Sequence, residues 1–234
     1  MAVGKVYLIP TVLHDEALPT IPAYVTDAVK QCTVFFVENE KTTRRFLKKL
    51  WKEMVIDDYS WFTIHKAEEE VKQNFITQLK AGKTIGIISE AGCPGVADPG
   101  QILVDTAQQL NIVVHPLVGP NSILLALMAS GMNGQCFQFH GYLPIDHHER
   151  KKKIKELEID SNKRNCTQIF IETPYRNNQL IKEIIETCKS ETRLCIAVDL
   201  TASTESIQTK NVLAWKKILP DIHKRPAIFL IYAQ

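Results

Sequence analysis

The sequence predicts an α/β protein built from two domains. In the first half, short apolar runs alternate with amphipathic segments, which is typical of crossover units and a largely parallel sheet. In the second half, one short run is placed to return as a hairpin, which predicts a mixed sheet. A segment with two prolines and one glycine, 115–120, separates the halves. We therefore expect an N-terminal domain at 1–116 and a C-terminal domain at 117–234.

Strands are expected where β-branched and aromatic residues gather in short, bounded runs. In the first half these runs are 6–9, 33–37, 61–64, 84–88 and 112–114. In the second half they are 137–140, 167–171, 193–198, 206–209 and 227–232. The run at 206–209 is the expected hairpin-like return.

Helices are expected where apolar residues recur at helical spacing. One such face consists of Phe46, Leu47, Leu50, Trp51 and Met54. Basic residues lie mostly on the opposite side of this helix. A second helical face consists of Leu180, Ile181, Ile184, Ile185 and Cys188. These segments fill the intervals between expected strands and support the α/β assignment.

Composition indicates a soluble globular protein. The chain has 234 residues, 45% of them hydrophobic, which is enough for a sizeable core. The formal net charge of +2 argues neither for nor against a nucleic-acid partner, so any basic surface must be local. The six cysteines lack metal or redox spacing and are expected to be reduced and buried. Neither a signal peptide nor an apolar run of about 20 residues is present, which predicts a cytoplasmic protein without a membrane partner.

The segment Ser89–Gly100 is the strongest functional candidate from physical chemistry alone. It follows an expected buried strand and holds three glycines and two prolines in twelve residues. Ligands of open α/β sheets bind at the carboxyl ends of strands. Glycines there allow close approach to the backbone, whose N–H groups can bind a carboxylate or phosphate. The alternative is an ordinary strand–helix connection, although such connections usually have two to six residues.

Several common chemistries are not supported by the motifs present. The chain has no G-x-G-x-x-G or G-x-x-x-x-G-K-[ST] motif, which argues against a dinucleotide site and a P-loop. It has no G-x-S-x-G elbow for a hydrolase serine. The seven histidines show no metal-binding spacing such as H-E-x-x-H, so no metal is expected.

Ser89–Gly100 resembles the S-[DE]-A-G-x-P-x-[IV]-[SA]-D-P-G segment of the tetrapyrrole-methylase superfamily. The similarity is greatest to the branch that methylates a ribose 2′-hydroxyl of bacterial 16S ribosomal RNA. Further segments resemble the family's motifs in the right order and extend the likeness from about residue 5 to 232. They are 8–11, 38–45, 116–122, 126–131, 139–144, 170–176 and 199–201.

The resemblance implies two α/β domains with S-adenosylmethionine in the cleft between them, a homodimer, and ribosomal RNA or the small ribosomal subunit as partner. Cofactor-binding residues carried over from the first domain are Pro10, Ser89, Glu90, Ala91, Gly92, Pro94, Val96 and Ala97. Those carried over from the second domain are Ser122, Thr173, Leu200, Thr201, Pro226 and Ala227.

Glu172 is the candidate general base, because a ribose hydroxyl is a poor nucleophile and Glu172 ends an expected strand within a matched block. The alternative is a structural pair with Arg176. Two basic segments, 41–52 and 150–155, could contact RNA phosphate. For the first, a solvated helix face is the favoured interpretation, whereas the second follows the 139–144 block where the family has an Arg-rich helix.

The acceptor is less well defined than the donor, because 11–18 lacks the glycine and asparagine of the ribosomal RNA branch. The K-G-E motif that this branch has near its last strand is also absent. Three functions therefore stay open at this point. They are an RNA methyltransferase, a methyltransferase acting on a tetrapyrrole or another small molecule, and a non-catalytic protein that binds S-adenosylmethionine.

Overall fold

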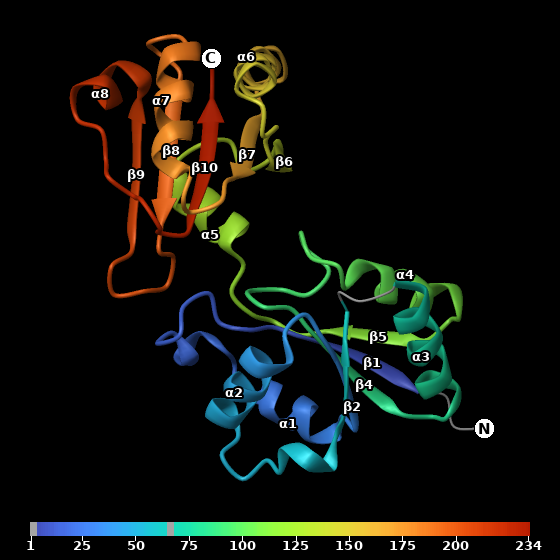
Figure 1. Ribbon diagram of the computed structural model, residues 1–234. Coiled ribbons are helices and arrows are strands. Elements are labelled where there is room, and N and C mark those ends of the chain that lie inside the picture. Colours follow the sequence, from blue (N-terminus) through green and yellow to red (C-terminus); the bar gives the residue numbers. More distant parts are fainter. Residues whose placement is uncertain (1–3, 65–67) are drawn as a thin grey trace. The chain divides into compact units, whose positions relative to one another are not determined.

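A computed structural model describes residues 4–64 and 68–234 and shows two compact units (Figure 1). The first unit extends to Asn121 and the second begins at Ser122. The predicted boundary at 116/117 falls at the end of a strand, since Pro116 still pairs with the first strand of the chain.

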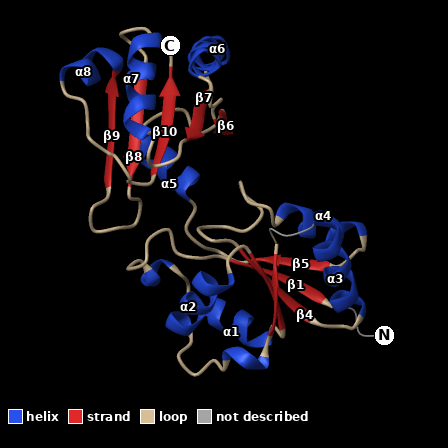
Figure 2. Ribbon diagram, viewed as in Figure 1, coloured by secondary structure: helices blue, strands red, loops and turns tan. Residues whose placement is uncertain are grey.

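The first unit is a five-stranded parallel sheet with helices on both faces (Figures 1 and 2). Its strands, in the order β3-β2-β4-β1-β5, pair in parallel throughout. They are β1 (Lys5–Ile9), β2 (Val34–Val37), β3 (Ser60–Thr63), β4 (Thr84–Ile88) and β5 (Val113–Pro116). Its helices are α1 (Tyr24–Gln31), α2 (Glu40–Leu50), α3 (Glu68–Lys80) and α4 (Gln101–Gln109), with short 3-10 turns at Leu18–Thr20 and Ile56–Asp58.

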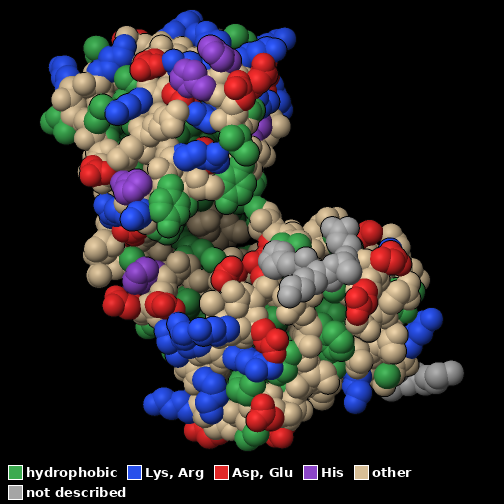
Figure 3. Space-filling model, viewed as in Figure 1, with side chains coloured by type: hydrophobic (Ala, Val, Ile, Leu, Met, Phe, Trp, Pro, Cys, Tyr) green, Lys and Arg blue, Asp and Glu red, His purple; other side chains and the backbone are tan. Residues whose placement is uncertain are grey.

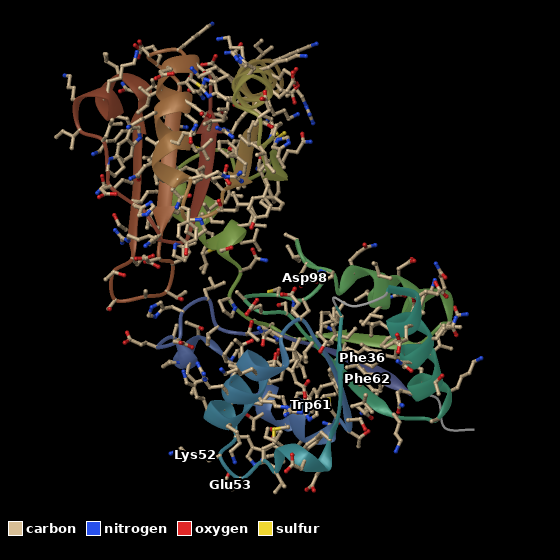
Figure 4. All side chains as sticks on the ribbon, in the orientation of Figure 1. Phe36, Lys52, Glu53, Trp61, Phe62 and Asp98 are labelled. Carbon is tan, nitrogen blue, oxygen red and sulfur yellow. The ribbon has the colours of Figure 1, made fainter. Side chains whose placement is uncertain are left out.

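Alternate residues of each strand supply two separate cores, as the two-residue period of a strand requires. Phe35 and Val37 pack toward α1 and α2, whereas Val34 and Phe36 pack toward α3 and α4. Phe36 stacks on Phe62 of β3 with ring centroids 4.8 Å apart (Figure 4). Burial on both faces explains why the inner strands β2 and β4 are almost continuous apolar runs.

The second unit is a mixed five-stranded sheet in the order β6-β7-β10-β8-β9. Only β6 and β7 pair in parallel, while β10 is antiparallel to both of its neighbours and β9 returns against β8. The strands are β6 (Phe137–Tyr142), β7 (Thr167–Ile171), β8 (Arg193–Val198), β9 (Ser206–Asn211) and β10 (Ala227–Tyr232). The helices are α5 (Ser122–Ser130), α6 (His147–Arg164), α7 (Asn177–Thr187) and α8 (Val212–Lys217).

The predicted parallel sheet, mixed sheet and hairpin-like return are thus confirmed. One helical face differs from the prediction, because α2 ends at Leu50 and the chain turns at Trp51. Met54 reaches the same core from the following loop and is 1% exposed. The Lys48 ammonium donates to the Met54 carbonyl at 2.9 Å and stabilises this turn.

The six cysteines are free, and four of them are buried. Burial raises the pKa of the Cys32 and Cys188 thiols to about 12, so both stay protonated at neutral pH. They act as small apolar core residues, as expected. None of the described helices is long and apolar enough to cross a bilayer.

A buried ion pair joins α6 to α7. The Arg150 guanidinium donates to the Glu183 carboxylate at 2.7 Å and to the Ile145 carbonyl at 2.7 Å. His147 Nδ1 lies 2.8 Å from the same carboxylate. Arg150 and Glu183 are 3% and 2% exposed, so this cluster fixes the start of α6 from within the unit.

The pKa of the Glu183 carboxyl lies well below its ordinary value. Burial by itself raises its pKa, but hydrogen bonds from Arg150, His147 and Gln179 outweigh burial and lower the pKa to about 2, from an ordinary value of 4.5. A lowered folded-state pKa contributes stability above pH 4.5, and this contribution is lost as the pH falls from 4.5 toward 2.

We predict that Glu183→Gln lowers the free energy of unfolding at pH 7 by about 3–5 kcal/mol, because it leaves the Arg150 charge buried without its partner. Denaturant unfolding of both proteins between pH 7 and pH 2 measures the difference. The difference should shrink below pH 4.5. Glu191→Gln, at an exposed residue, is the control and should change little. A Glu183→Gln effect that is independent of pH contradicts the assignment.

Candidate functional site

The Ser89–Gly100 loop is attached to the end of β1 by a short bridge. The Thr11 N–H donates to the Gly92 carbonyl at 2.9 Å, and the Thr11 hydroxyl donates to the Ser89 carbonyl at 3.3 Å. Both Thr11 and Ser89 are 3% exposed. The loop therefore begins from a buried, hydrogen-bonded base at the carboxyl edge of the sheet.

The Asp98 carboxylate closes the second half of this loop. Its two oxygens accept from the Gly95 N–H at 2.8 Å and from the Gly100 N–H at 2.7 Å. Burial raises the pKa of Asp98, and the two backbone donors act in the opposite direction. Figure 4 shows Asp98 on the loop next to α4. A side chain at position 100 would place its Cβ 2.9 Å from an Asp98 oxygen, which explains the glycine there.

Three residues of the loop adopt left-handed backbone conformations. Gly92 and Gly95 have φ of +76° and +81°, which glycine tolerates at no steric cost. Ala97 has φ of +58°, which is uncommon for a residue with a Cβ. Strained backbone of this kind is concentrated at ligand sites and is held there by surrounding hydrogen bonds.

The predicted donor residues of the first unit fall into a buried and an exposed group. Pro10, Ser89, Gly92 and Pro94 are buried and support the loop. Glu90, Ala91, Val96 and Ala97 are exposed, so their backbone and side chains are accessible to a ligand. Pro10 also lies against Gly119, where any Cβ would come within 2.1 Å of its ring.

A cavity of about 310 Å³ lies beside the loop, within the first unit. Its lining combines the turn after β1, one face of α2 and the start of the loop. The lining residues are Thr11, Val12, Leu13, His14, Asp15, Thr42, Thr43, Phe46, Ser89, Glu90 and Ala91. Four hydroxyls, two carboxylates and an imidazole line this cavity. They supply both hydrogen-bond donors and hydrogen-bond acceptors, as recognition of a polar ligand requires.

Sequence reasoning did not place the α2 residues Thr42, Thr43 and Phe46 at the site. The available signal was the resemblance of 38–45 to a family motif, which now has a structural explanation. The Glu38 carboxylate accepts from the Glu90 N–H at 3.1 Å, so the segment after β2 also holds the loop.

The second unit gathers its predicted residues at one edge of its sheet. This edge is formed by the carboxyl ends of β7 and β8 and by the start of β10. The Asp199 N–H donates to the Pro226 carbonyl at 2.9 Å, and Ile171 pairs with Ile228. Glu172, Thr173, Pro226 and Ala227 therefore lie on neighbouring strand ends, with Leu200 and Thr201 in the turn after β8. Ser122 is the first residue of α5.

The Glu172 carboxylate is engaged on one oxygen only. Its Oε1 accepts from the Arg176 guanidinium at 2.6 and 3.0 Å and from the Thr173 N–H at 2.6 Å. Its Oε2 is buried without a hydrogen-bond partner in the described chain. The side chain of Glu172 is 1% exposed. The pair with Arg176 that the sequence suggested as an alternative role is therefore present.

The turn after β8 is strained as well. Asp199 and Thr201 have φ of +50° and +71°, although neither is glycine. Asp199 accepts from Thr204 and Arg225 at 2.8 Å, and the Thr201 N–H donates to Glu205 at 2.7 Å. The Thr201 hydroxyl is buried and, among the residues described, has no partner. This edge thus holds two buried oxygen atoms with unused hydrogen-bonding capacity.

The basic segment 150–155 does not present the charges that its sequence suggested. Arg150 is buried against Glu183, so it is not available to a phosphate. Three lysines of α6 have acidic partners, Lys151 with Glu186, Lys153 with Glu156 and Lys155 with Glu158. The prediction that this run is a free basic patch is wrong for Arg150, because tertiary packing uses its charge inside the unit.

Within residues 4–64 and 68–234, no group of three or more His, Cys, Asp or Glu side chains could hold a metal ion.

Comparisons with known proteins agree with the arrangement of these motifs. Residues 5–213 match the family model described as Tetrapyrrole (Corrin/Porphyrin) Methylases. The chain is 31% identical to a Ribosomal RNA small subunit methyltransferase I of Buchnera aphidicola, over 97% of this chain and 78% of that protein.

Solved structures show the same fold. The methyltransferase CobJ aligns with a TM-score of 0.65 at 13% identity, over 99% of this chain and 94% of its own. A uroporphyrin-III C-methyltransferase from Thermus thermophilus, solved with S-adenosylhomocysteine, aligns with a TM-score of 0.57 at 14% identity, over 98% and 97% of the two chains.

The match to the family model covers most of the chain, including the Ser89–Gly100 loop that the bridge between Thr11 and Gly92 attaches to β1. The chain belongs to the tetrapyrrole methylase family and is an S-adenosylmethionine-dependent methyltransferase.

Proposed function

We propose that this enzyme methylates RNA of the small ribosomal subunit, at a ribose 2′-hydroxyl. The observation that carries the proposal is the similarity, over 97% of the chain, to a protein named as a methyltransferase of small-subunit ribosomal RNA. The polar cavity in the first unit supports the proposal, because a site that binds a nucleoside needs hydrogen-bond donors and acceptors along its walls.

The turn that departs from the ribosomal RNA branch keeps its connection to the loop. Thr11 is the residue that bridges to Gly92, and it precedes the altered positions. In the altered part, Leu13 lies 3.3 Å from the position a Cβ would take on Gly92. The departure therefore changes the cavity wall and leaves the attachment of the loop intact.

The proposal assigns donor binding to the residues predicted from the sequence. In the first unit, exposed backbone at Glu90, Ala91, Val96 and Ala97 would hold the donor, supported by Pro10, Ser89, Gly92 and Pro94. In the second unit, the assigned residues are Ser122, Thr173, Leu200, Thr201, Pro226 and Ala227. The Thr201 hydroxyl is buried and has no hydrogen-bond partner among the described residues, so it is available to a polar group of the donor at that edge.

S-adenosylmethionine supplies a methyl group activated by its sulfonium sulfur. The residues of the chain have to orient the acceptor and exclude water, since methyl transfer is an in-line displacement. The fixed loop and the buried strand ends are suited to this orienting role.

A homodimer and a cytoplasmic location belong to the same proposal. Both are supported by the family resemblance. Leu124 and Met128 of α5 are 48% and 79% exposed and lie one turn apart, which provides an apolar surface for self-association.

Methyl transfer from radiolabelled S-adenosylmethionine tests the acceptor directly. We expect label in 16S ribosomal RNA when the acceptor is small subunits from a strain lacking this gene, and at a position resistant to alkaline cleavage. Label in a tetrapyrrole offered in parallel, without label in RNA, would assign the other acceptor class. Donor binding in calorimetry without transfer to either acceptor would indicate a non-catalytic protein.

Glu172 is proposed to position the edge of the second sheet, since its carboxylate holds Arg176 and the Thr173 N–H. Glu172→Gln should raise KM for the donor about tenfold, the cost of weakening a charged hydrogen bond, and leave the pH profile of kcat unchanged. Glu186→Gln, at an exposed glutamate of α7, is the matched control. A fall in kcat of about 10²–10⁴ with loss of a basic pH limb would instead identify Glu172 as the general base.

A further inference from the structure

One dense group of cations lies on and just after α2. Between residues 40 and 52 there are six lysines and arginines and a single acidic residue, although the whole chain has a net charge of only +2. Lys and Arg side chains gather on the surface over α2 (Figure 3). The local excess is what phosphate binding requires of a protein with little bulk charge.

Three of the six cations are used within the unit. Arg44 pairs with Glu40 and lies 5.1 Å over the Trp61 ring. Lys48 donates to the carbonyls that follow the helix. Lys49 pairs with Asp15 at 3.3 Å and so holds the turn that lines the cavity. These charges have explanations in the structure of the first unit.

The other three cations are exposed, and in the described part of the chain none has an acidic partner. They are Lys41, Arg45 and Lys52. Lys52 extends into solvent beyond the end of α2 (Figure 4). Lys41 lies in the first turn of the helix, where the helix dipole favours acids, so helix stability does not explain it. These side chains are free to bind an external anion.

Lys41 and Arg45 lie on α2, the helix that supplies Thr42, Thr43 and Phe46 to the cavity lining. They are four residues apart and therefore neighbours on the helix surface. A polynucleotide with one nucleoside in the cavity would continue across α2, and its neighbouring phosphates would then come within reach of the two cations.

The basic run of α6 contrasts with α2. Arg150 is buried, and Lys151, Lys153 and Lys155 have acidic partners, which leaves Lys152 as the exposed cation of 150–155 without an ion pair to a described residue. The sequence favoured α6 over α2 as an RNA contact, and the pairing of the charges reverses that order.

We propose that Lys41 and Arg45 on α2 bind the phosphates of the RNA that flank the nucleotide to be methylated. The proposal rests on the RNA acceptor proposed above and adds the surface that recognises it. It assigns binding energy to α2 and none to Lys152 of α6.

The test compares two charge reversals in the first unit. Lys41→Glu with Arg45→Glu removes the proposed contacts. Lys80→Glu with Lys83→Glu is the matched control, because both lysines are exposed and lie at the opposite, amino edge of the sheet next to β4. Lys152→Glu tests α6. Filter binding to small subunits from the deletion strain, at several salt concentrations, gives the slope of log K against log salt.

We expect the α2 variant to bind about tenfold or more weakly and to lose about 1.5 from the magnitude of the slope, for two phosphate contacts. The control and Lys152→Glu should keep the wild-type slope. Calorimetry with S-adenosylmethionine and circular dichroism should be unchanged in all variants. If the double reversal does not fold, Lys41→Gln with Arg45→Gln tests the same contacts and should lose the same part of the slope.

Two failures are distinguishable. Wild-type enzyme that transfers no methyl group to RNA overturns the proposed function. Wild-type enzyme that methylates RNA, together with an α2 variant whose slope equals that of the control, overturns the α2 surface and leaves the function standing. A larger loss of slope in Lys152→Glu than in the α2 variant also overturns it.

Discussion

The loop after β4 has one shape because a single carboxylate closes it. Asp98 accepts from two backbone N–H groups, at Gly95 and Gly100, while Thr11 fixes the other half through Gly92. Hydrogen bonds to a charged acceptor are stronger than neutral ones, so they can hold the left-handed backbone at Ala97. The exposed peptide groups of the loop are thereby preorganised, and ordering them on binding costs little entropy.

Charge pairing separates the parts of the molecule that maintain the fold from the parts open to a partner. Arg150 and Glu183 form an ion pair inside the second unit, and three lysines of α6 form ion pairs with nearby glutamates. Glu172 is intermediate, since its Oε1 accepts from Arg176, whereas its Oε2 is buried and has no hydrogen-bond partner in the described part of the chain. On α2, Lys41 and Arg45 have no such role. These surfaces differ in whether their charged side chains already form ion pairs, rather than in how many charged side chains they carry.

Local patterns predicted the fold well because most strands are short apolar runs with their own boundaries. Thr84–Ile88 and the glycine- and proline-rich segment after it could be placed as a strand followed by a long loop from composition alone. The return of Ser206–Asn211 against β8 could also be predicted, since a hairpin joins strands that are close in sequence.

The parts that could not be predicted depend on contacts between residues distant in sequence. Arg150 appears in the sequence as one of four consecutive cations, and only its packing against Glu183 removes it from the surface. Periodicity assigned Trp51 and Met54 to α2, whereas Lys48 binds carbonyls of a turn there. The cavity is formed by three segments, after β1, β2 and β4, which meet only at the edge of the folded sheet.

The central claim is that the closed Ser89–Gly100 loop binds the methyl donor, and calorimetric titration of S-adenosylmethionine into Asp98→Asn tests it most directly. The amide places an NH₂ group where a carboxylate oxygen accepts, so one of the two backbone bonds is lost. The account predicts donor affinity about tenfold weaker or more, and no change for Asp105→Asn, an exposed residue of α4. Equal donor affinity in Asp98→Asn and wild-type protein would contradict it.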